Sequence, residues 1–424
     1  NDLLYTGGTL YVGGSFTGAG GTATQSVARY SGGAWGTITG GTVNAFIFDF
    51  ERNPAGTIFT AGAFTSAGGT ATARFVATLI ADKWGTLAGG TLTDIPYALL
   101  FSSLGTLYAA GQFTGAHGSA ARYVARHVNG AWGTLIGGTV NAPATLVTEA
   151  PDRSLFVGGG FTVAGGSIAN LIASYNGTWG TLGAGLRPAT GAIYGINIGA
   201  DGRAYVLGRF STVGTMAGTD TGIWNGASWT PMAAGLGTSG AGVYRILTRA
   251  NGNIIAAGDF SNSGARLLPS YMAIWQGAAW VPIDVLFPPN PQTSGNFTPG
   301  VFCIVESPEG TLYVAGNFSG TAEAPTVANL VNGGGAAAYP TIRLRNTAAT
   351  GTARVFQAAN TLTGDVIYFD LNLLPSEQVT INLSPGSRTI TSTNRGNILS
   401  SVIGGSNLAT WRLLSGTNTV SVFA

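Results

Sequence analysis

Few side chains in this chain could carry out acid–base or metal chemistry. The 424 residues include two histidines, His117 and His127, and a single cysteine, Cys303. A metal site needs three or four converging ligands, and a catalytic thiol needs a polarising base nearby, but no such partner recurs near these residues. His127 takes the place of Tyr30 and Tyr175 in a repeated pattern described below, which indicates an aromatic substitute within a strand. His117 replaces a loop glycine. Cys303, in the apolar run VFCIVES, is predicted to be a small buried hydrophobe.

The carboxylates also lack a catalytic pattern. Seventeen Asp and Glu residues are scattered along the chain without a paired motif, and Asp49 and Glu51 alternate along a predicted strand. Glycoside hydrolysis needs two carboxylates flanking the scissile bond, and no such pair is marked by a motif. We therefore predict no catalytic residue, no metal and no cofactor. A polysaccharide hydrolase or lyase is the less favoured alternative.

Polar residues gather instead at one variable position of a repeat, between a constant glycine and a constant phenylalanine. This position holds Ser15, Ala63, Gln112, Gly160, Arg209, Asp259 and Asn317. Because side chains alternate along a strand, it faces away from the phenylalanine, near the strand end. Gln112, Arg209, Asp259 and Asn317 are predicted to form a polar recognition rim. The alternative is that they only form hydrogen bonds where neighbouring sheets meet.

The Pro-rich stretch 287–300, FPPNPQTSGNFTPG, is predicted to be the largest loop and to join this rim through Asn290, Gln292 and Asn296. Deleting residues 288–299 is expected to weaken attachment to a ligand while sparing stability and oligomeric state.

These positions belong to an internal repeat that organises most of the chain. GTLYVGGSFTGAGGT near the start returns as GTIFTAGAFTSAGGT and in five further copies, with phenylalanine spacings of 48, 49, 48, 49, 50 and 58 residues. The phenylalanines are Phe16, Phe64, Phe113, Phe161, Phe210, Phe260 and Phe318. The glycines two residues earlier are Gly14, Gly62, Gly111, Gly159, Gly208, Gly258 and Gly316. Six copies end in a tryptophan, at Trp35, Trp84, Trp132, Trp179, Trp229 and Trp280.

Each copy predicts four short strands. An apolar strand, a tight Gly-containing turn, the LYVGGSF strand, a Gly-rich loop, a third strand and a short Trp-bearing strand follow in order. Units of this length repeated about seven times are typical of a β-propeller, so residues 1–338 are predicted to form one of approximately seven blades. Large side chains are expected to fill hollows left by the constant small residues.

The predicted ring has a weak point where its ends meet. Asn1–Tyr5 provides only a stub of a first strand, and the seventh copy lacks its tryptophan strand. The stub or residues 336–340 could complete the last blade, so six or eight blades stay open.

Composition excludes several classes of partner. Charged residues make up 8% of the chain, against roughly 25% in a typical soluble domain, and the formal net charge is +2. Such a balance provides no electrostatic attraction for nucleic acid. No apolar stretch is long enough to cross a membrane, and no signal peptide is visible. We expect neither nucleic-acid binding nor membrane insertion.

The repeat stops before residues 339–424, which alternate polar and apolar residues between turn signals and predict a small antiparallel β-sandwich. The final segment LLSGTNTVSV, with Leu413, Gly416, Asn418 and Val420, follows the stretch SRTITSTNRGN at 387–397. This ending resembles the C-terminal domain of siphovirus-type phage tail components of the distal-tail group. The resemblance implies a galectin-like sandwich in which these positions are structural. The ring-forming N-terminal domain of that group has no counterpart here.

The resulting expectation is a virion structural protein: a peripheral tail, tip or fibre component whose propeller attaches to a host-surface glycan or protein. The resemblance implies other virion tail proteins as partners and a homo-oligomer. A secreted lectin or cell-surface repeat protein, located outside the cell and unrelated to a virus, is the alternative. Tail genes beside this one would favour the first reading.

Overall fold

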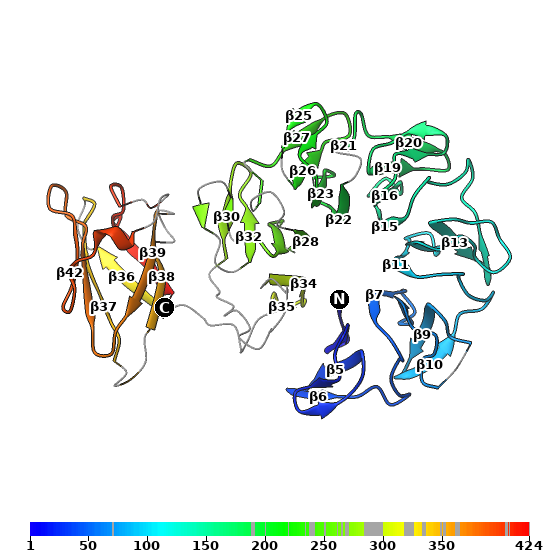
Figure 1. Cartoon of the computed structure of the whole chain (residues 1–424), viewed down its shortest axis with the longest axis horizontal. Helices are drawn as coiled ribbons and strands as arrows, with labels where there is room; N and C mark the ends of the chain where they lie inside the picture. The colour runs from blue at the N-terminus through cyan, green and yellow to red at the C-terminus, as the bar shows by residue number, and fades with distance from the viewer. Residues whose placement is uncertain are drawn as a thin grey trace. The chain divides into compact units, whose positions relative to one another are not determined.

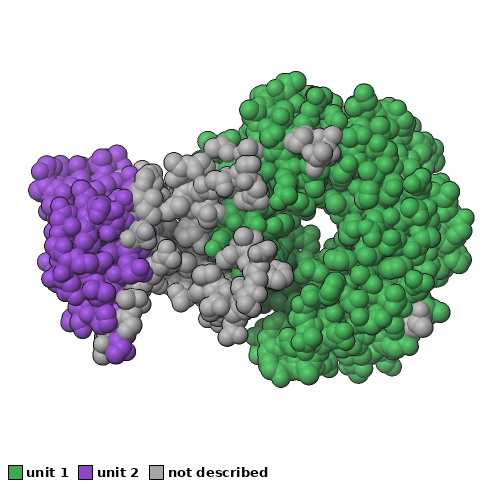
Figure 2. All heavy atoms as spheres, in the orientation of Figure 1, with its two compact units in different colours: residues 1–260, 271–281, 293–317 green, residues 261–270, 282–292, 318–424 purple. Residues whose placement is uncertain are grey.

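The computed structural model describes two compact units built from strands. It describes residues 1–424 except 70–71, 188–190, 200, 219, 234, 237–241, 250–251, 261, 264–265, 268–270, 284–299, 318–325, 333–335, 348–349, 351–352, 361–364, 403–405, 407 and 424. Unit 1 comprises residues 1–260, 271–281 and 293–317, and unit 2 comprises 261–270, 282–292 and 318–424 (Figure 2). Among the described residues, the helical structure is one 3₁₀ turn, η1 (Leu399–Ser401), and no helix could span a membrane. The predicted all-β class is confirmed.

Six four-stranded antiparallel sheets follow one another along unit 1, each with its strands in chain order. The first sheet has β1 (Asp2–Thr6), β2 (Thr9–Gly13), β5 (Val27–Ser31) and β6 (Ala34–Gly36), and the second has β7 (Ile47–Arg52), β8 (Ile58–Gly62), β9 (Val76–Ile80) and β10 (Lys83–Thr86). The third has β11 (Pro96–Phe101), β12 (Leu107–Gly111), β13 (Val124–Val128) and β14 (Ala131–Gly133), and the fourth has β15 (Ala144–Glu149), β16 (Leu155–Gly159), β19 (Ile172–Tyr175) and β20 (Trp179–Thr181). The fifth has β22 (Ala192–Ile198), β23 (Ala204–Arg209), β26 (Thr221–Trp224) and β27 (Trp229–Pro231), and the sixth has β28 (Val243–Thr248), β29 (Ile254–Gly258), β32 (Met272–Trp275) and β33 (Trp280–Pro282). A two-stranded sheet of β34 (Gly300–Glu306) and β35 (Leu312–Asn317) comes last.

Several Gly-rich loops between second and third strands contain short hairpins rather than open turns. These are β3 (Gly18–Ala19) with β4 (Thr22–Ala23), β17 (Val163–Ala164) with β18 (Ser167–Ile168), and β24 (Thr212–Val213) with β25 (Met216–Ala217) and β21 (Leu186–Arg187). A further hairpin, β30 (Asn262–Ser263) with β31 (Arg266–Leu267), follows β29 in the chain. Where the loop meets the connection from the preceding sheet, as in Val43 with Ala67, a single backbone bridge links them.

The sheets of unit 1 succeed one another around a centre, with the first strand of each sheet innermost (Figure 1). Apolar cores lie between successive sheets: Val27 of the first packs with Ile47 of the second, and Ile172 of the fourth with Ile193 of the fifth. Leu3 and Leu10 of the first sheet share a core with Cys303 of β34. Because the last sheet thus packs on the first, unit 1 has a β-propeller-like arrangement.

The constant glycine of the repeat is explained by a β-bulge in the neighbouring innermost strand. In five sheets, a Cβ at this glycine would run into a carbonyl of that strand; at Gly111 the obstacles are the Ile95 carbonyl and Pro96 Cα, the latter at 2.6 Å. The next N–H, on Gln112, donates to the same Ile95 carbonyl at 2.9 Å. The glycine therefore permits a close backbone approach, and at Gly62 and Gly258 an added Cβ would also meet the ring of the following phenylalanine, at 2.8 Å.

Replacing Gly111 with alanine should destabilise unit 1 by about 1–3 kcal/mol, because the added methyl meets backbone atoms that cannot rotate away. Gly133 is the matched control, since a Cβ there meets nothing within 4 Å. Thermal unfolding monitored by circular dichroism measures the difference. Equal melting temperatures for the two variants would contradict the bulge explanation.

The tryptophans of the fourth strands pack on a different set of glycines, in the Gly-rich loops. Gly20 lies under Trp35, Gly68 under Trp84 and Gly165 under Trp179; the latter two indoles donate Nε1–H to the connection entering their sheet. Five of the six tryptophans also contact an aromatic ring of the third strand, whereas Trp84 lies opposite Leu79. The pairs, with centroids 5.1–5.3 Å apart, are Tyr30–Trp35, His127–Trp132, Tyr175–Trp179, Trp224–Trp229 and Trp275–Trp280.

Unit 2 contains two four-stranded sheets with a shared apolar core. One has β36 (Thr326–Asn332), β43 (Gly416–Phe423), β38 (Ala353–Asn360) and β39 (Asp365–Leu373), and the other has β37 (Thr341–Arg345), β40 (Gln378–Asn382), β41 (Thr389–Ser392) and β42 (Gly396–Asn397). Residues of both sheets, including Phe369 and Ile381, bury their side chains together around Trp411. The two sheets therefore pack face to face.

The division of the chain differs from the predicted 338/339 boundary. Residues 326–332, which the repeat assigned to the third strand of the seventh copy, form β36 and pair along their length with β43 in unit 2. Ala338, proposed as part of a segment that completes the ring, pairs with Leu413 instead. In the described part of unit 1, the last sheet consequently has two strands. A cut near residue 335 would separate β36 from the sheet to which it belongs.

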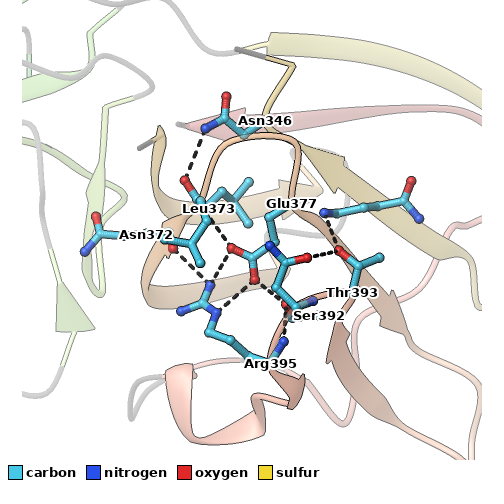
Figure 3. A network of polar contacts seen from close by, with 10 residues as sticks. Asn346, Asn372, Leu373, Glu377, Ser392, Thr393 and Arg395 are labelled. Carbon is cyan, nitrogen blue, oxygen red and sulfur yellow. Dashed lines mark hydrogen bonds and ion pairs between the residues drawn. The ribbon is translucent and has the colours of Figure 1, made fainter. Parts of the chain in front are cut away.

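An ion pair between the buried Glu377 and the exposed Arg395 organises the turns of unit 2 (Figure 3). Glu377 is fully buried and accepts hydrogen bonds from the Leu374 N–H at 2.6 Å, from the Ser392 hydroxyl, and from Arg395 Nε at 2.8 Å. Arg395 also donates to the Asn372 carbonyl at 2.9 Å. These bonds lower the pKa of Glu377 against the opposing effect of burial. The stretch 387–397 thus has a structural role.

Candidate functional site

The innermost strands of unit 1 line a central cavity of about 570 Å³, and Figure 2 shows an opening at the centre of this unit. Every innermost strand from β7 to β34 shifts register by one residue against its neighbour, and the extra residue is the one that lines the cavity. A bulge re-aims a side chain in this way. These bulge residues, here called the collar, are Phe48, Tyr97, Thr145, Tyr194, Tyr244 and Phe302.

Aromatic contacts tie the collar together. The rings of Phe48 and Tyr97 meet edge to face with centroids 5.8 Å apart. Tyr244 contacts Tyr194 at 5.7 Å and Phe302 at 5.3 Å. Each ring is held by a ring of the adjacent sheet, so the collar offers fixed aromatic surfaces around the cavity.

Polar side chains orient two of the collar tyrosines. The Tyr97 hydroxyl donates to Gln112 Oε1 at 2.7 Å, and Gln112 Nε2 donates to Asp94 at 3.3 Å. The Tyr244 hydroxyl donates to Asp259 Oδ2 at 3.0 Å, and the other carboxylate oxygen of Asp259 accepts from the Gly242 N–H. Burial, followed by the negative charge of Asp259, raises the pKa of Tyr244 to about 12. Both phenols therefore stay protonated at physiological pH.

Deeper in the wall lies a charged cluster of Asp2, Asp49 and Arg245. Arg245 forms an ion pair with Asp2, whose other oxygen accepts from the Phe50 N–H at 2.9 Å. Asp49 and Arg245 line the cavity, and Asp49 Oδ2 accepts from the Leu99 N–H of the next sheet at 2.6 Å. Burial and the charge of Asp2 raise the pKa of Asp49 well above its usual range. The charge of Asp2 raises the pKa of Arg245, which stays a cation.

Glu51 lies two residues along β7 from Asp49, and its raised pKa leads us to expect that the stability of unit 1 depends on pH. Burial raises the pKa of this carboxyl from 4.5 to about 7. A raised carboxyl pKa gives stability that is complete below the unfolded value of about 4.3 and is lost as pH rises through the folded value near 7. The shift corresponds to about 3 kcal/mol at most.

Exchanging Glu51 for glutamine should therefore flatten the fall in melting temperature between pH 4.5 and 7.5. Exchanging the exposed Asp152 for asparagine provides the control. A Glu51→Gln profile as steep as that of the unchanged protein would refute this assignment.

The structure gathers several of the predicted rim residues at the collar. Gln112 and Asp259 bond directly to collar tyrosines, and the charge of Arg209 acts on Tyr244. Asn317 pairs with Gly300 at the start of β34 and lies at the corresponding end of the last sheet. Among the repeat positions, Phe318 lies outside the described residues, as do the loop residues Asn290, Gln292 and Asn296.

Sequence reasoning missed the collar itself, because the first strand of each repeat was interpreted only as apolar. A signal was present: each collar residue precedes the constant phenylalanine by the same 16 residues, from Phe48 and Phe64 to Phe302 and Phe318. The charged cluster had no such signal, because Asp2 and Arg245 are 243 residues apart.

The predicted roles of the histidines and the cysteine agree with the structure. His127 contacts the ring of Trp132 edge to face, at the place where Tyr30 contacts Trp35, and His117 adopts the left-handed backbone of the glycine it replaces. Cys303 is buried beside Leu3, and burial raises the pKa of its thiol to about 11. Within the described ranges, no three His, Cys, Asp or Glu side chains converge on a point that could hold a metal ion.

Comparison with known proteins supports the fold. No protein-family model and no curated protein matches the sequence. The chain is similar to the extracellular domain of a hybrid two-component system from B. thetaiotaomicron, with a TM-score of 0.50 and 8% identity over 92% of this chain, which spans 44% of that one. Virginiamycin B lyase from Staphylococcus aureus has a TM-score of 0.48 and 12% identity, with coverage of 74% of this chain and 90% of that one. The WD40 β-propeller domain of Doa1 has a TM-score of 0.37 and 9% identity, with coverage of 65% and 91%. At such identities the likeness concerns the fold alone.

Proposed function

We propose that this chain is a structural protein of a phage tail, a peripheral, tip or fibre component, whose propeller attaches the virion to a glycan on the host surface. The collar is the observation that supports the attachment role. Tyr97, Tyr194 and Tyr244 present ring faces and hydroxyls around a cavity of about 570 Å³, within the range of small-molecule sites. Sugars offer C–H faces for such rings and hydroxyls for such polar groups.

Binding without bond cleavage fits the wall of this cavity. Asp49 is the one carboxylate among the described residues that line it. Glycosidases act through two carboxylates on either side of the bond, whereas Asp2, the carboxylate beside Asp49, is buried and held in an ion pair with Arg245. We therefore infer a ligand-binding protein rather than an enzyme.

We further propose that unit 1 is a seven-bladed propeller with an incomplete last blade. Seven successive innermost strands contribute to the cavity or its core, and β34 packs against both β28 and β1. Stacking of Tyr5 on Tyr313 of β35, at 5.4 Å, supports closure between the first and last sheets.

The proposed tail role rests on the C-terminal resemblance, and unit 2 supports a structural reading of its residues. Asn418 is fully buried, accepts from the Leu414 N–H at 2.9 Å and donates to the Leu414 carbonyl at 2.7 Å, which fixes the turn before β43. Leu413 and Val420 are in the core. We propose that unit 2 is a galectin-like sandwich that contacts other tail proteins and a second copy of the chain.

Two measurements test this function. Gold-labelled antibodies against the chain should decorate tails in electron micrographs of phage particles, and labelled full-length protein should bind spots of a glycan array. Decoration of capsids, or of no particles, would refute the tail location. Glycan binding without a virion would instead favour an extracellular lectin, and loss of viscosity in a polysaccharide solution would favour a hydrolase or lyase.

A further inference from the structure

We propose that the central cavity takes an uncharged saccharide and discriminates against the same saccharide bearing carboxylates. The inference deepens the proposed attachment function and depends on it. It follows from the balance of charges that face the cavity.

The two cations of the wall are already engaged. The Asn1 ammonium donates to the Gly13 carbonyl at 3.0 Å, and burial lowers its pKa. Arg245 is paired with Asp2, a carboxylate that is 5% exposed and that also accepts from the Phe50 N–H and, at 3.5 Å, from the Cys303 thiol. Because Asp2 is buried and accepts three hydrogen bonds, separating it from the Arg245 guanidinium would cost free energy. A ligand carboxylate could pair with Arg245 only by displacing the carboxylate of Asp2.

The nearest acidic group adds to the discrimination. Asp49 lines the cavity beside the carboxylate of Asp2, and burial, followed by the charge of Asp2, raises its pKa. A carboxylate brought by the ligand would encounter the same field. A neutral sugar hydroxyl, by contrast, could donate to the free face of Asp49 or accept from Arg245 without adding charge.

The collar, like the wall, has carboxylates and hydrogen-bond acceptors close to the cavity. Asp259 and Asp94 stand behind the collar tyrosines. Burial raises the pKa of Asp220 to about 6, against the lowering effects of the Phe210 N–H and of the positive charge of Arg209. Because their protons are donated to Asp259 and Gln112, the hydroxyls of Tyr244 and Tyr97 can act toward a ligand only as hydrogen-bond acceptors. Lone pairs accept from sugar hydroxyls and repel carboxylates.

The inference can be tested with pairs of oligosaccharides that differ only at C6. One member of each pair is a neutral hexose oligomer, and the other is the corresponding uronic acid oligomer. Isothermal titration of the full-length protein at low salt should give a dissociation constant at least tenfold lower for the neutral member of a pair. Added salt should narrow this difference, because screening weakens the repulsion. Equal or tighter binding of the uronate would overturn the inference and leave the attachment function standing. Binding of neither member of any pair would overturn both.

The Asp49→Asn variant provides a second readout. Asparagine removes the possibility of a negative charge at this position while Asp2 stays in place, so the neutral member of a pair should still bind at least tenfold more tightly than the uronate. A preference that disappears in a variant with unchanged melting temperature would show that an ionised Asp49 causes the discrimination, which would contradict the proposal. The outer-strand variant Trp35→Ala controls for general effects of substitution.

Discussion

Replacing Tyr244 with alanine should weaken saccharide binding at least 30-fold, or about 2 kcal/mol, the scale of a central aromatic contact. Tyr244 contacts the rings of Tyr194 and Phe302, so its loss removes one aromatic surface and releases two others. It also leaves Asp259 without the phenol that it accepts from. Titration with the tightest-binding neutral oligosaccharide measures the effect.

Two matched variants separate this effect from a general loss of structure. Tyr244→Phe keeps the ring and should cost less than tenfold in affinity. Trp35→Ala removes an aromatic ring that is 37% exposed on a fourth strand and should leave binding unchanged. If Trp35→Ala weakened binding and Tyr244→Ala did not, the ligand would bind at the outside of the ring, and the collar would be excluded as the site.

Replacing Arg395 with alanine should destabilise unit 2 by about 2–3 kcal/mol, because it removes charge-assisted hydrogen bonds from the buried Glu377, whereas the exposed Arg395 is partly screened by water. Hydrogen exchange of peptides covering residues 371–398 in the full chain reports on this unit directly. The exposed Arg343 on β37 provides a control that should change stability by less than about 0.5 kcal/mol.

The same ion pair makes unit 2 sensitive to acid. Because the pKa of Glu377 is lowered in the folded protein, its stabilising effect is present above the unfolded value of about 4.3 and is lost as pH falls through the folded value. Exchange of these peptides should accelerate below pH 4 in the unchanged protein, with a weaker pH dependence in the Arg395→Ala variant. Identical pH profiles would show that another group controls the acid response.

Local chemistry accounts for what the sequence predicted correctly. The strand pattern, the Gly-containing turns and the 48–50-residue period each concern residues that are close along the chain. The exchange of His127 for tyrosine was visible for the same reason, since the repeat aligns it with Tyr30 and its partner Trp132 with Trp35. The repeat also marked Gln112 and Asp259 as unusual without showing what they contact.

By itself, then, the sequence determined the all-β class, the repeat and the positions at which polar residues replace small ones. Only the tertiary structure decided that these positions meet the bulge residues at a central cavity, because a one-residue register shift changes which face a side chain occupies. It also decided that Asp2 pairs with Arg245 and that β36 pairs with β43. Those contacts join residues far apart in the chain. Pairing between distant strands depends on which sheet edge the fold brings close to them, and no local sequence pattern encodes that edge.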